Sequence, residues 1–346
     1  MLYATTRDKI AAYTAQQALT EERAPDGGIY MPEKLPLFSR EELEAILKEP
    51  EPEIIARVLN LFFDGTLGRL EVEFEVGRRI IGMARISHRI VIGELWRNPE
   101  GGFEGLCNRL AQRLCTEGTA QKPGTWMRIA CRVALIFAIF SRLRREGILA
   151  DEELLDVAAL AGDFESPYAL HVARNMGLPI GEIICCCNAN AGLWELFSFG
   201  QLKTSAKQVE TLTPLCDRVV PAALELLIRE RLHEDDVMNY FDALERGGNF
   251  FLEPEAHQQL REGFSASVVS DRRMRLAMPN LYNTNGYILG PYSALVYTGL
   301  MDYRSHPGPR RTALMLTEHD PRENSDIVTR ALVLSDEELD QWCRHG

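Results

Sequence analysis

The chain has 346 residues, of which 46% are apolar and 25% are charged. This composition is typical of globular proteins and the length suffices for one large core or two domains, so disorder of the whole chain is excluded. The 50 acidic residues outnumber the 38 basic ones and give a formal charge of −12, which argues against nucleic acid as the main partner. Six of the basic residues are lysines: Lys9, Lys34, Lys48, Lys122, Lys203 and Lys207.

Cysteine usage and the N-terminus indicate a compartment. The eight cysteines are scattered along the chain without the spacing of a disulfide framework, which favours a reducing cytoplasm. The polar start MLYATTRDKI predicts that there is no signal peptide. The longest uncharged apolar stretch, Val133–Ser141, is too short to span a bilayer. We therefore expect a soluble, cytoplasmic protein with no membrane partner.

The first half of the chain predicts helices and short strands. About the first 90 residues read as short strands and turns followed by helices, one of which begins at an N-cap serine, Ser39. Apolar residues then recur at helical spacing from Trp126 to Phe140. This pattern predicts a largely buried helix over residues 126–146.

The second half predicts an α/β fold with a mostly parallel sheet. Residues 154–193 read as a strand, a helix that ends at Gly177 and a second strand. Such a short crossover implies parallel strands in a sheet covered on both faces, with ligands bound beyond the carboxyl ends of the strands, near Gly162 and Asn188. A third strand is predicted over residues 311–318, after a helix over residues 291–303.

Three consecutive cysteines, Cys185, Cys186 and Cys187, lie on the second predicted strand. Because side chains alternate along a strand, Cys185 and Cys187 share one face and Cys186 points to the other. Buried small hydrophobic thiols are the usual outcome for such residues. A metal site would need two further ligands, and no Cys/His pair at zinc-finger spacing supplies them, so we expect none.

Several separated segments carry motifs in a common order. They are YATTRDK with APDGGIYMPEKLPLFSREEL, then MRIACRVALIFAIFSRL, AGDFESPYALHVARNMGLPI, CCCNANAGL, GYILGPYSALVY and LTEHDP. These segments resemble the threonine synthase family, pyridoxal-phosphate (PLP) enzymes of fold type II, the tryptophan-synthase-like fold. The resemblance implies a threonine synthase N-terminal domain over residues 1–93 and a PLP-type large domain over residues 94–346.

The resemblance breaks where the family holds its cofactor. The family's lysine stands in the motif Leu-Phe-His-Gly-Pro-Thr-Leu-Ala-Phe-Lys-Asp, and the matching segment here is LWRNPEGGFEG. Pro99 and Phe103 align with the motif, but Glu104 falls at the lysine position and Arg97 at the histidine position. A carboxylate cannot form a Schiff base or move the substrate proton as the amine does. We therefore expect no PLP cofactor.

A second break lies in the connection CTEGTAQKPG, residues 115–124. The family carries an entire small domain at this place, and here the chain passes directly to the predicted buried helix. The loss of that domain would open the cofactor cleft and remove the exclusion of water on which PLP chemistry depends.

The segment GDFESP resembles the family's phosphate loop, yet its chemistry suits a phosphate poorly. Gly162 permits the close approach that a phosphate needs, but Asp163 and Glu165 place negative charges beside it. Ser166 is a good N-cap and Pro167 is favoured at the first helical position. We therefore predict that this helix caps itself where the family binds an anion.

The remaining site residues have a plain and a functional interpretation. Glu104 is either a solvated glutamate facing the former cleft or the partner of an arginine such as Arg97 that fills the vacated space. Asn188 and Asn190 are either turn residues that bond the local backbone or ligands in a pocket. Thr317 corresponds to the residue that would face the cofactor ring nitrogen, in a segment that otherwise reads as a polar turn with His319. Tyr292 is expected to be a packed aromatic residue.

Three functional hypotheses follow. The first is a catalytically inactive threonine synthase-like protein that acts in binding or interaction, with a homodimer or a partner protein covering the open cleft. The remnant of its cofactor site would comprise Phe103, Glu104, Gly162, Asp163, Ser166, Asn188, Asn190 and Thr317. The alternative is a residual PLP-dependent lyase acting on O-phosphohomoserine or a similar amino acid, which would require Lys203 or Lys207 to enter the cleft. A third hypothesis is a sensor of a small amino-acid ligand, lined by Asn188, Asn190 and Thr317.

Overall fold

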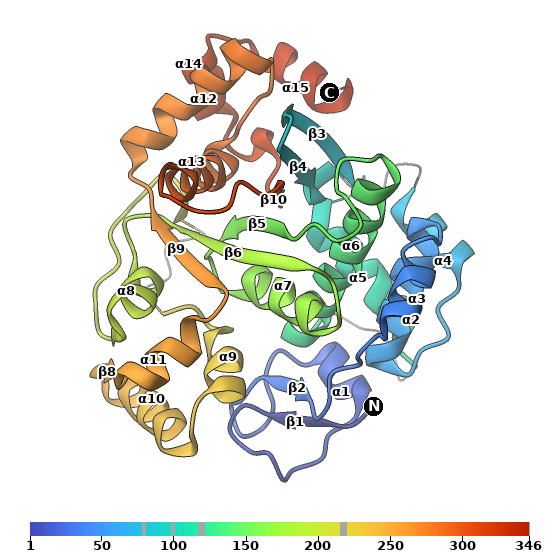
Figure 1. The fold of residues 1–346 in the computed structure, drawn as a ribbon, viewed down its shortest axis with the longest axis vertical. Helices are drawn as coiled ribbons and strands as arrows, with labels where there is room; N and C mark the ends of the chain where they lie inside the picture. The colour runs from blue at the N-terminus through green and yellow to red at the C-terminus, as the bar shows by residue number, and fades with distance from the viewer. Residues whose placement is uncertain (78–80, 98–100, 117–121, 215–219, 346) are drawn as a thin grey trace.

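The computed structural model describes residues 1–77, 81–97, 101–116, 122–214 and 220–345 (Figure 1). Pro99 and residues 117–121 of the predicted connection lie outside these ranges. The N-terminal part pairs β1 (Tyr3–Thr5) with β2 (Tyr30–Pro32) and adds four helices. The helices are α1 (Ala15–Thr20), α2 (Arg40–Ile46), α3 (Glu51–Phe63) and α4 (Arg69–Val76). No helix of the described residues is long and apolar enough to cross a membrane.

A six-stranded sheet forms the centre of the molecule. Its order is β3 (Gly82–Ser87), β4 (Ile90–Glu94), β10 (Ala313–Thr317), β5 (Leu155–Leu160), β6 (Ile180–Cys187) and β9 (Phe264–Val268). Only the β3–β4 pair is antiparallel, and the other neighbours are parallel. The predicted domain boundary at residues 93 and 94 falls inside β4, because β3 and β4 pair with this sheet and not with the N-terminal strands.

Helices cover both faces of the sheet, as the short crossover predicts. One face packs against α5 (Gly102–Leu114), α6 (Thr125–Arg145), α7 (Glu165–Asn175) and α8 (Gly192–Phe199). The other packs against α12 (Asp271–Asn285) and α13 (Pro291–Ser305). The cysteines follow this division, since Cys185 and Cys187 belong to the first core and Cys186 to the second. All three are buried, so the alternation and burial predicted for them are confirmed.

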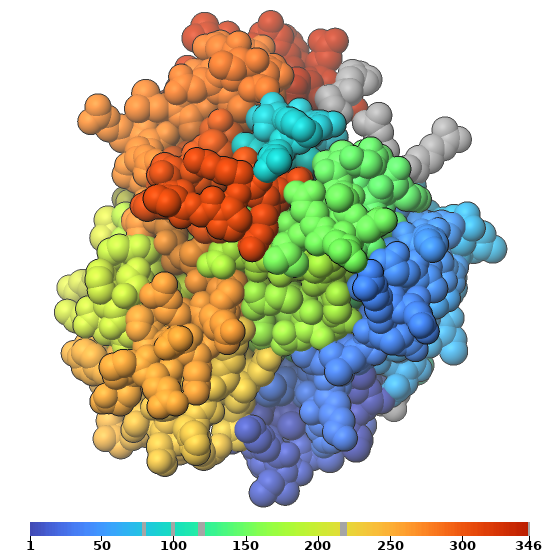
Figure 2. Space-filling view, viewed as in Figure 1, coloured from blue at the N-terminus to red at the C-terminus, as the bar shows by residue number. Residues whose placement is uncertain are grey.

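The remaining elements lie at the two ends of the molecule. The segment between β6 and β9 contains β7 (Gln201–Lys203), β8 (Asn249–Phe251), α9 (Leu224–Arg231), α10 (Glu234–Arg246) and α11 (Pro254–Arg261). The chain ends with η3 (Pro321–Asn324), α14 (Ser325–Leu332) and α15 (Asp336–His345), while η1 (Leu95–Arg97) follows β4. In the space-filling view the N-terminal residues abut the α6–α7 region and α9 (Figure 2). Buried Glu225 of α9 secures this contact by accepting hydrogen bonds from Thr6 and Arg23.

Several predicted elements are confirmed. The predicted buried helix is α6, in which all but a few side chains are buried. The strand, helix and strand over residues 154–193 are β5, α7 and β6, and the strand predicted over residues 311–318 is β10. Ser39 caps α2 by accepting a hydrogen bond from the backbone of Glu42.

The predicted start of α7 is wrong. Phe164 is the N-cap, with a left-handed backbone at φ +69°, and Pro167 is the third residue of the helix rather than the first. The cause is tertiary packing, since the fully buried Phe164 ring contacts Phe197 and Phe264. Ser166 does not cap the helix, and no side chain forms an N-cap hydrogen bond there. The prediction that this helix caps itself is therefore wrong.

Candidate functional site

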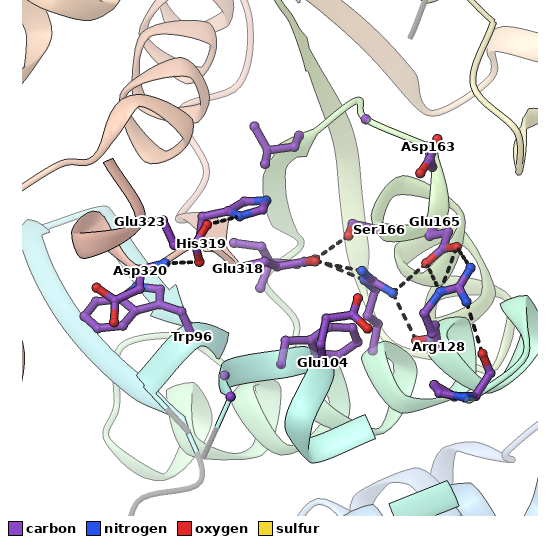
Figure 3. Close-up of a pocket in the computed structure, with 18 of the residues that line it drawn as sticks. Trp96, Glu104, Arg128, Asp163, Glu165, Ser166, Glu318, His319, Asp320 and Glu323 are labelled. Carbon is purple, nitrogen blue, oxygen red and sulfur yellow. Dashed lines mark hydrogen bonds and ion pairs between the residues drawn. The ribbon is translucent and has the colours of Figure 1, made fainter. Parts of the chain in front are cut away.

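A pocket of about 960 Å³ lies at the carboxyl ends of β4, β5 and β10 (Figure 3). Its walls come from the first turns of α5, α6 and α7 and from the segment that follows β10. The position agrees with the sequence-based expectation that a parallel sheet binds ligands beyond its carboxyl edge. Gly162 lies in the wall with φ +41°, and a Cβ added to it would meet nothing within 4 Å.

The pocket brings together part of the predicted site. Five of the predicted site residues line it: Phe103, Glu104, Gly162, Asp163 and Ser166. They come from three places in the chain: the start of α5, the turn after β5 and the first turn of α7.

Asn188, Asn190 and Thr317 do not line this pocket. The amide of Asn188 donates to the hydroxyls of Thr211 and Thr213, and Asn190 exchanges two hydrogen bonds with the backbone of Val209. Both asparagines therefore fasten residues 209–213, in agreement with their plain interpretation as structural residues. Thr317 is buried and donates to the carbonyl oxygen of Gly93. The hypothesis of a sensor site lined by these three residues is not supported at this pocket.

A chain of alternating charges crosses the pocket, and we call it the arginine–carboxylate network: Glu22, Arg128, Glu165, Arg132 and Glu318. Arg128 donates from Nη1 to Glu22 at 2.7 Å and from Nε to both oxygens of Glu165 at 3.1 Å. Arg132 donates from Nη1 to the Oε2 of Glu165 at 2.8 Å. Its Nε and Nη2 bind the two oxygens of Glu318 at 3.1 and 2.8 Å.

The network extends to two neighbours. Ser166, predicted as the N-cap of α7, instead donates its hydroxyl to Glu318. The Arg132 guanidinium also lies 4.1 Å from the centre of the Phe103 ring, which is a favourable cation–π distance. The network therefore joins the N-terminal part, α6, the start of α7 and the segment after β10 (Figure 3).

The network fixes the ionisation of its members. Burial opposes the charge of Glu318, but the positive charge and hydrogen bonds of Arg132, with the hydroxyl of Ser166, hold the Glu318 pKa below its ordinary value. Burial likewise opposes the charge of Arg132. The neighbouring carboxylates, first of all Glu318 and Glu165, outweigh this effect and raise the pKa of the guanidinium. Hydrogen bonds from Arg128 lower the pKa of Glu22. All three groups are charged at neutral pH.

Glu104 forms no hydrogen bond or ion pair with this network, although its charge is among those that raise the pKa of Arg132. It is exposed at the start of α5, and no hydrogen bond or ion pair joins it to another residue that the structure describes. The predicted alternative, a pair with Arg97, does not occur. Arg97 instead binds buried Glu94 and lies over the Trp96 ring at 4.4 Å. Glu104 therefore corresponds to the plain interpretation of a solvated carboxylate that faces the pocket.

The positions of Lys203 and Lys207 do not meet the requirement of the alternative hypothesis. Lys203 and Lys207 are exposed and do not line the pocket, so the requirement that one of them enter the cleft is not met. The lysine that does line the pocket, among the described residues, is Lys122. It is exposed and lies in the short connection that precedes α6.

The opposite wall is aromatic and acidic. His319 stacks on Tyr292 with ring centres 4.0 Å apart, and its Nδ1 lies 2.9 Å from a carboxylate oxygen of Glu323. Asp320 pairs with Arg322 at the same edge. The expectation that Tyr292 is a packed aromatic residue is confirmed, since it is buried on α13.

Sequence reasoning missed the centre of the site. Arg128, Arg132 and Glu318 carry the network, and none of them was a candidate. A signal was present, because two arginines four residues apart in an otherwise buried helix need anionic partners. Their partner Glu318 lies 186 residues away from Arg132, and no local pattern indicates such a contact.

Comparison with known proteins agrees with this architecture. A family model described as "Threonine synthase N terminus" matches residues 2–74. "Threonine synthase-like 1" of Homo sapiens is 27% identical over 173 residues, which are 49% of this chain and 23% of that protein. "Threonine synthase" of Pseudomonas aeruginosa is 22% identical over 396 aligned positions, covering 85% of this chain and 83% of that protein. The chain belongs to the threonine synthase family.

A solved structure shows the same fold. PLP-bound threonine synthase from Brucella melitensis superposes with a TM-score of 0.84 at 18% identity, covering 100% of this chain and 95% of that one. The α/β fold with a mostly parallel sheet is thus that of the threonine synthases, PLP fold type II. The matched stretch spans less than a quarter of the length of threonine synthase-like 1.

The pocket of this threonine synthase family member does not fit PLP. Seven carboxylate side chains line it against four Lys or Arg side chains, counted over the described residues. A phosphate needs free donors, but both arginines of α6 are already bonded to carboxylates. Asp163 and Glu165 stand at the start of α7, where a phosphate would meet the helix dipole.

Proposed function

We propose that this threonine synthase family member is catalytically inactive and acts as a binding or interaction protein. The observation that carries the proposal is Glu104, which lines the pocket at the position where the family's motif has its cofactor lysine. A carboxylate there cannot form the Schiff base on which the chemistry of the family depends. No catalytic residue and no bound PLP are expected in this protein.

The short connection between α5 and α6 supports the proposal. Residues 115–124 join these helices, where the family has its small domain by the resemblance of the flanking motifs. The alignment with the Pseudomonas aeruginosa protein contains 396 positions, more than this chain has residues, so some positions have no counterpart here. A pocket without the closing domain stays open to water, which is unsuited to carbanion chemistry.

The open pocket suggests what the protein binds. A second copy of the chain, a partner protein or a small amino-acid ligand would cover the side that the small domain covers in the family. Nucleic acid and membranes are not expected partners, since the chain carries a formal charge of −12 and a cytoplasmic location is proposed.

Incubation with PLP tests the proposal. The absorbance of a Schiff base is recorded, the sample is reduced with borohydride, and modified lysines are mapped by mass spectrometry. We expect no specific adduct. Lys122→Arg and Lys203→Arg are matched controls, because both keep the charge and only Lys122 lines the pocket. A stoichiometric adduct that Lys122→Arg abolishes and Lys203→Arg leaves intact would overturn the proposal.

The alternative is a residual PLP-dependent lyase, and the observation that favours it is Lys122 in the pocket wall. Lys122 would then have to take the role first assigned to Lys203 or Lys207. Release of phosphate from O-phosphohomoserine, lost in Lys122→Arg, would establish this alternative. Absence of turnover in the presence of PLP would exclude it and leave the inactive protein.

A further inference from the structure

Two arginines of α6, Arg128 and Arg132, face the pocket one helical turn apart. We propose that they form an anion-binding site that the chain fills with its own carboxylates, Glu165 and Glu318. The self-filled site excludes phosphate-bearing ligands from the pocket. This inference concerns the same pocket as the proposed function. It rests on that function, because it requires that the pocket holds no PLP.

The geometry of Arg132 is that of a ligand-binding arginine. Its Nε and Nη2 grip the two oxygens of Glu318 side by side, and its Nη1 holds Glu165. A guanidinium offers this planar fork equally to a carboxylate and to a phosphate. The Arg132 side chain is 9% exposed, so an arginine without an anion there would carry a large desolvation cost.

The two carboxylates bind the arginines in the wall of the pocket. Glu165 stands at the start of α7 and Glu318 just after β10, and both line the pocket as the arginines do. Their side chains are 10% and 15% exposed, and each carboxylate is bonded to at least one of the two arginines. Arg132 donates to Glu165 through Nη1 and to Glu318 through Nε and Nη2, and Figure 3 labels both carboxylates at the pocket wall. On this proposal, a phosphate that binds both guanidinium groups competes with Glu165 and Glu318 for the same N–H donors.

The position of the arginines in α6 strengthens the inference. Arg128 is the fourth residue of the helix, so it lies near the positive end of the helix dipole, where cations are disfavoured. Nearby anions relieve that cost. Because Glu22 also binds Arg128, the site stays partly neutralised when Glu165 is changed.

Titration with inorganic phosphate tests the inference. Binding is measured by calorimetry and by the shift of the thermal midpoint at constant ionic strength, on the wild type and on Glu165→Gln, Glu318→Gln and the double variant. Glutamine keeps a hydrogen-bond acceptor but removes the charge. We expect no measurable phosphate binding by the wild type and at least tenfold tighter binding by the double variant, with intermediate gains in the single variants.

Two controls separate self-filling from a change of net charge. Glu104→Gln removes one pocket carboxylate that does not touch the arginines, and Glu51→Gln removes the carboxylate that bridges Arg142 and Arg145 at the far end of α6. Neither should gain phosphate affinity. Circular dichroism confirms that each variant is folded, and the single variants decide the matter if the double variant does not fold.

Equal phosphate binding by the wild type and the double variant would overturn the inference. So would a gain in Glu104→Gln as large as that in Glu318→Gln, because net charge alone would then explain the effect. These outcomes are independent of the PLP test. A covalent adduct at Lys122 would overturn the inactive function, whereas phosphate binding by the wild type would overturn only the self-filled site.

Discussion

The two ends of α6 carry the same chemistry in different surroundings. At the C-terminal end, Glu51 of α3 binds Arg142 at 2.7 Å and Arg145 at 2.8 Å. At the N-terminal end, Glu165 of α7 bridges Arg128 and Arg132 in the same way. In both places one largely buried carboxylate joins two arginines of one helix to a neighbouring helix.

The two ends of α6 differ in the direction of the helix dipole and in whether a cavity adjoins them. Arginines at the C-terminal end complement the helix dipole, and Arg142 is further held by the carbonyl oxygen of Ile81. Arg128 opposes the dipole and faces a pocket of about 960 Å³ together with Arg132. At the pocket end, the ion pair lies where a ligand would compete for the arginines. At the other end, the same kind of ion pair is a contact between two helices.

Removal of one arginine at each end gives the largest expected difference. Arg132→Ala leaves Glu318 without its arginine partner and removes one of the two arginines that bind Glu165, in a largely buried place, which should cost about 3–5 kcal/mol of unfolding free energy. Arg142→Ala should cost less, because the Arg142 side chain is 21% exposed and Arg145 stays on Glu51. Urea denaturation measures both variants. An equal or larger loss in Arg142→Ala would break the distinction between the two ends.

Local patterns in the sequence were sufficient for most of the fold. Apolar spacing from Trp126 to Phe140 predicted α6, and alternation placed Cys186 on the opposite face from its neighbours, because both features depend on residues close in sequence. The start of α7 could not be predicted in this way. Its N-cap is Phe164, whose conformation is fixed by packing against Phe264, 100 residues later in the chain.

In the candidate site, too, residues within local motifs could be predicted and contacts between distant segments could not. Phe103 and Gly162 were found because each lies within a local motif that ends at the edge of the sheet. Asn188 also follows a strand, but residues 209–213 fold back over it, and no local pattern indicates that contact. The bonds from Arg132 to Glu318 join residues far apart in the chain, so the centre of the site becomes visible only in the folded structure.

Acid should weaken the pocket end of α6 through Glu318. Its pKa is lowered in the folded protein, so its stabilising contribution is present above the ordinary glutamate pKa near 4.5 and is lost as the pH falls through the lower folded value. We expect about 1–3 kcal/mol of pH-dependent stability from its hydrogen bonds to Arg132. Denaturation between pH 6 and pH 3 measures it, with Glu318→Gln as the control. An unchanged pH dependence in that variant would contradict the assignment of this contribution to Glu318.

The smallest expected effect lies beside the network, at Glu104. Because Glu104 is exposed and bonds to no other described residue, Glu104→Gln should change the unfolding free energy by no more than about 0.5 kcal/mol. Glu165→Gln, which removes a charge of the same sign from the same pocket, should be clearly more destabilising, since it weakens bonds to two arginines. Thermal and urea unfolding of the two variants give the difference directly. A loss in Glu104→Gln as large as in Glu165→Gln would place Glu104 inside the network, and the pocket would then be held together by all of its carboxylates rather than by those that touch Arg128 and Arg132.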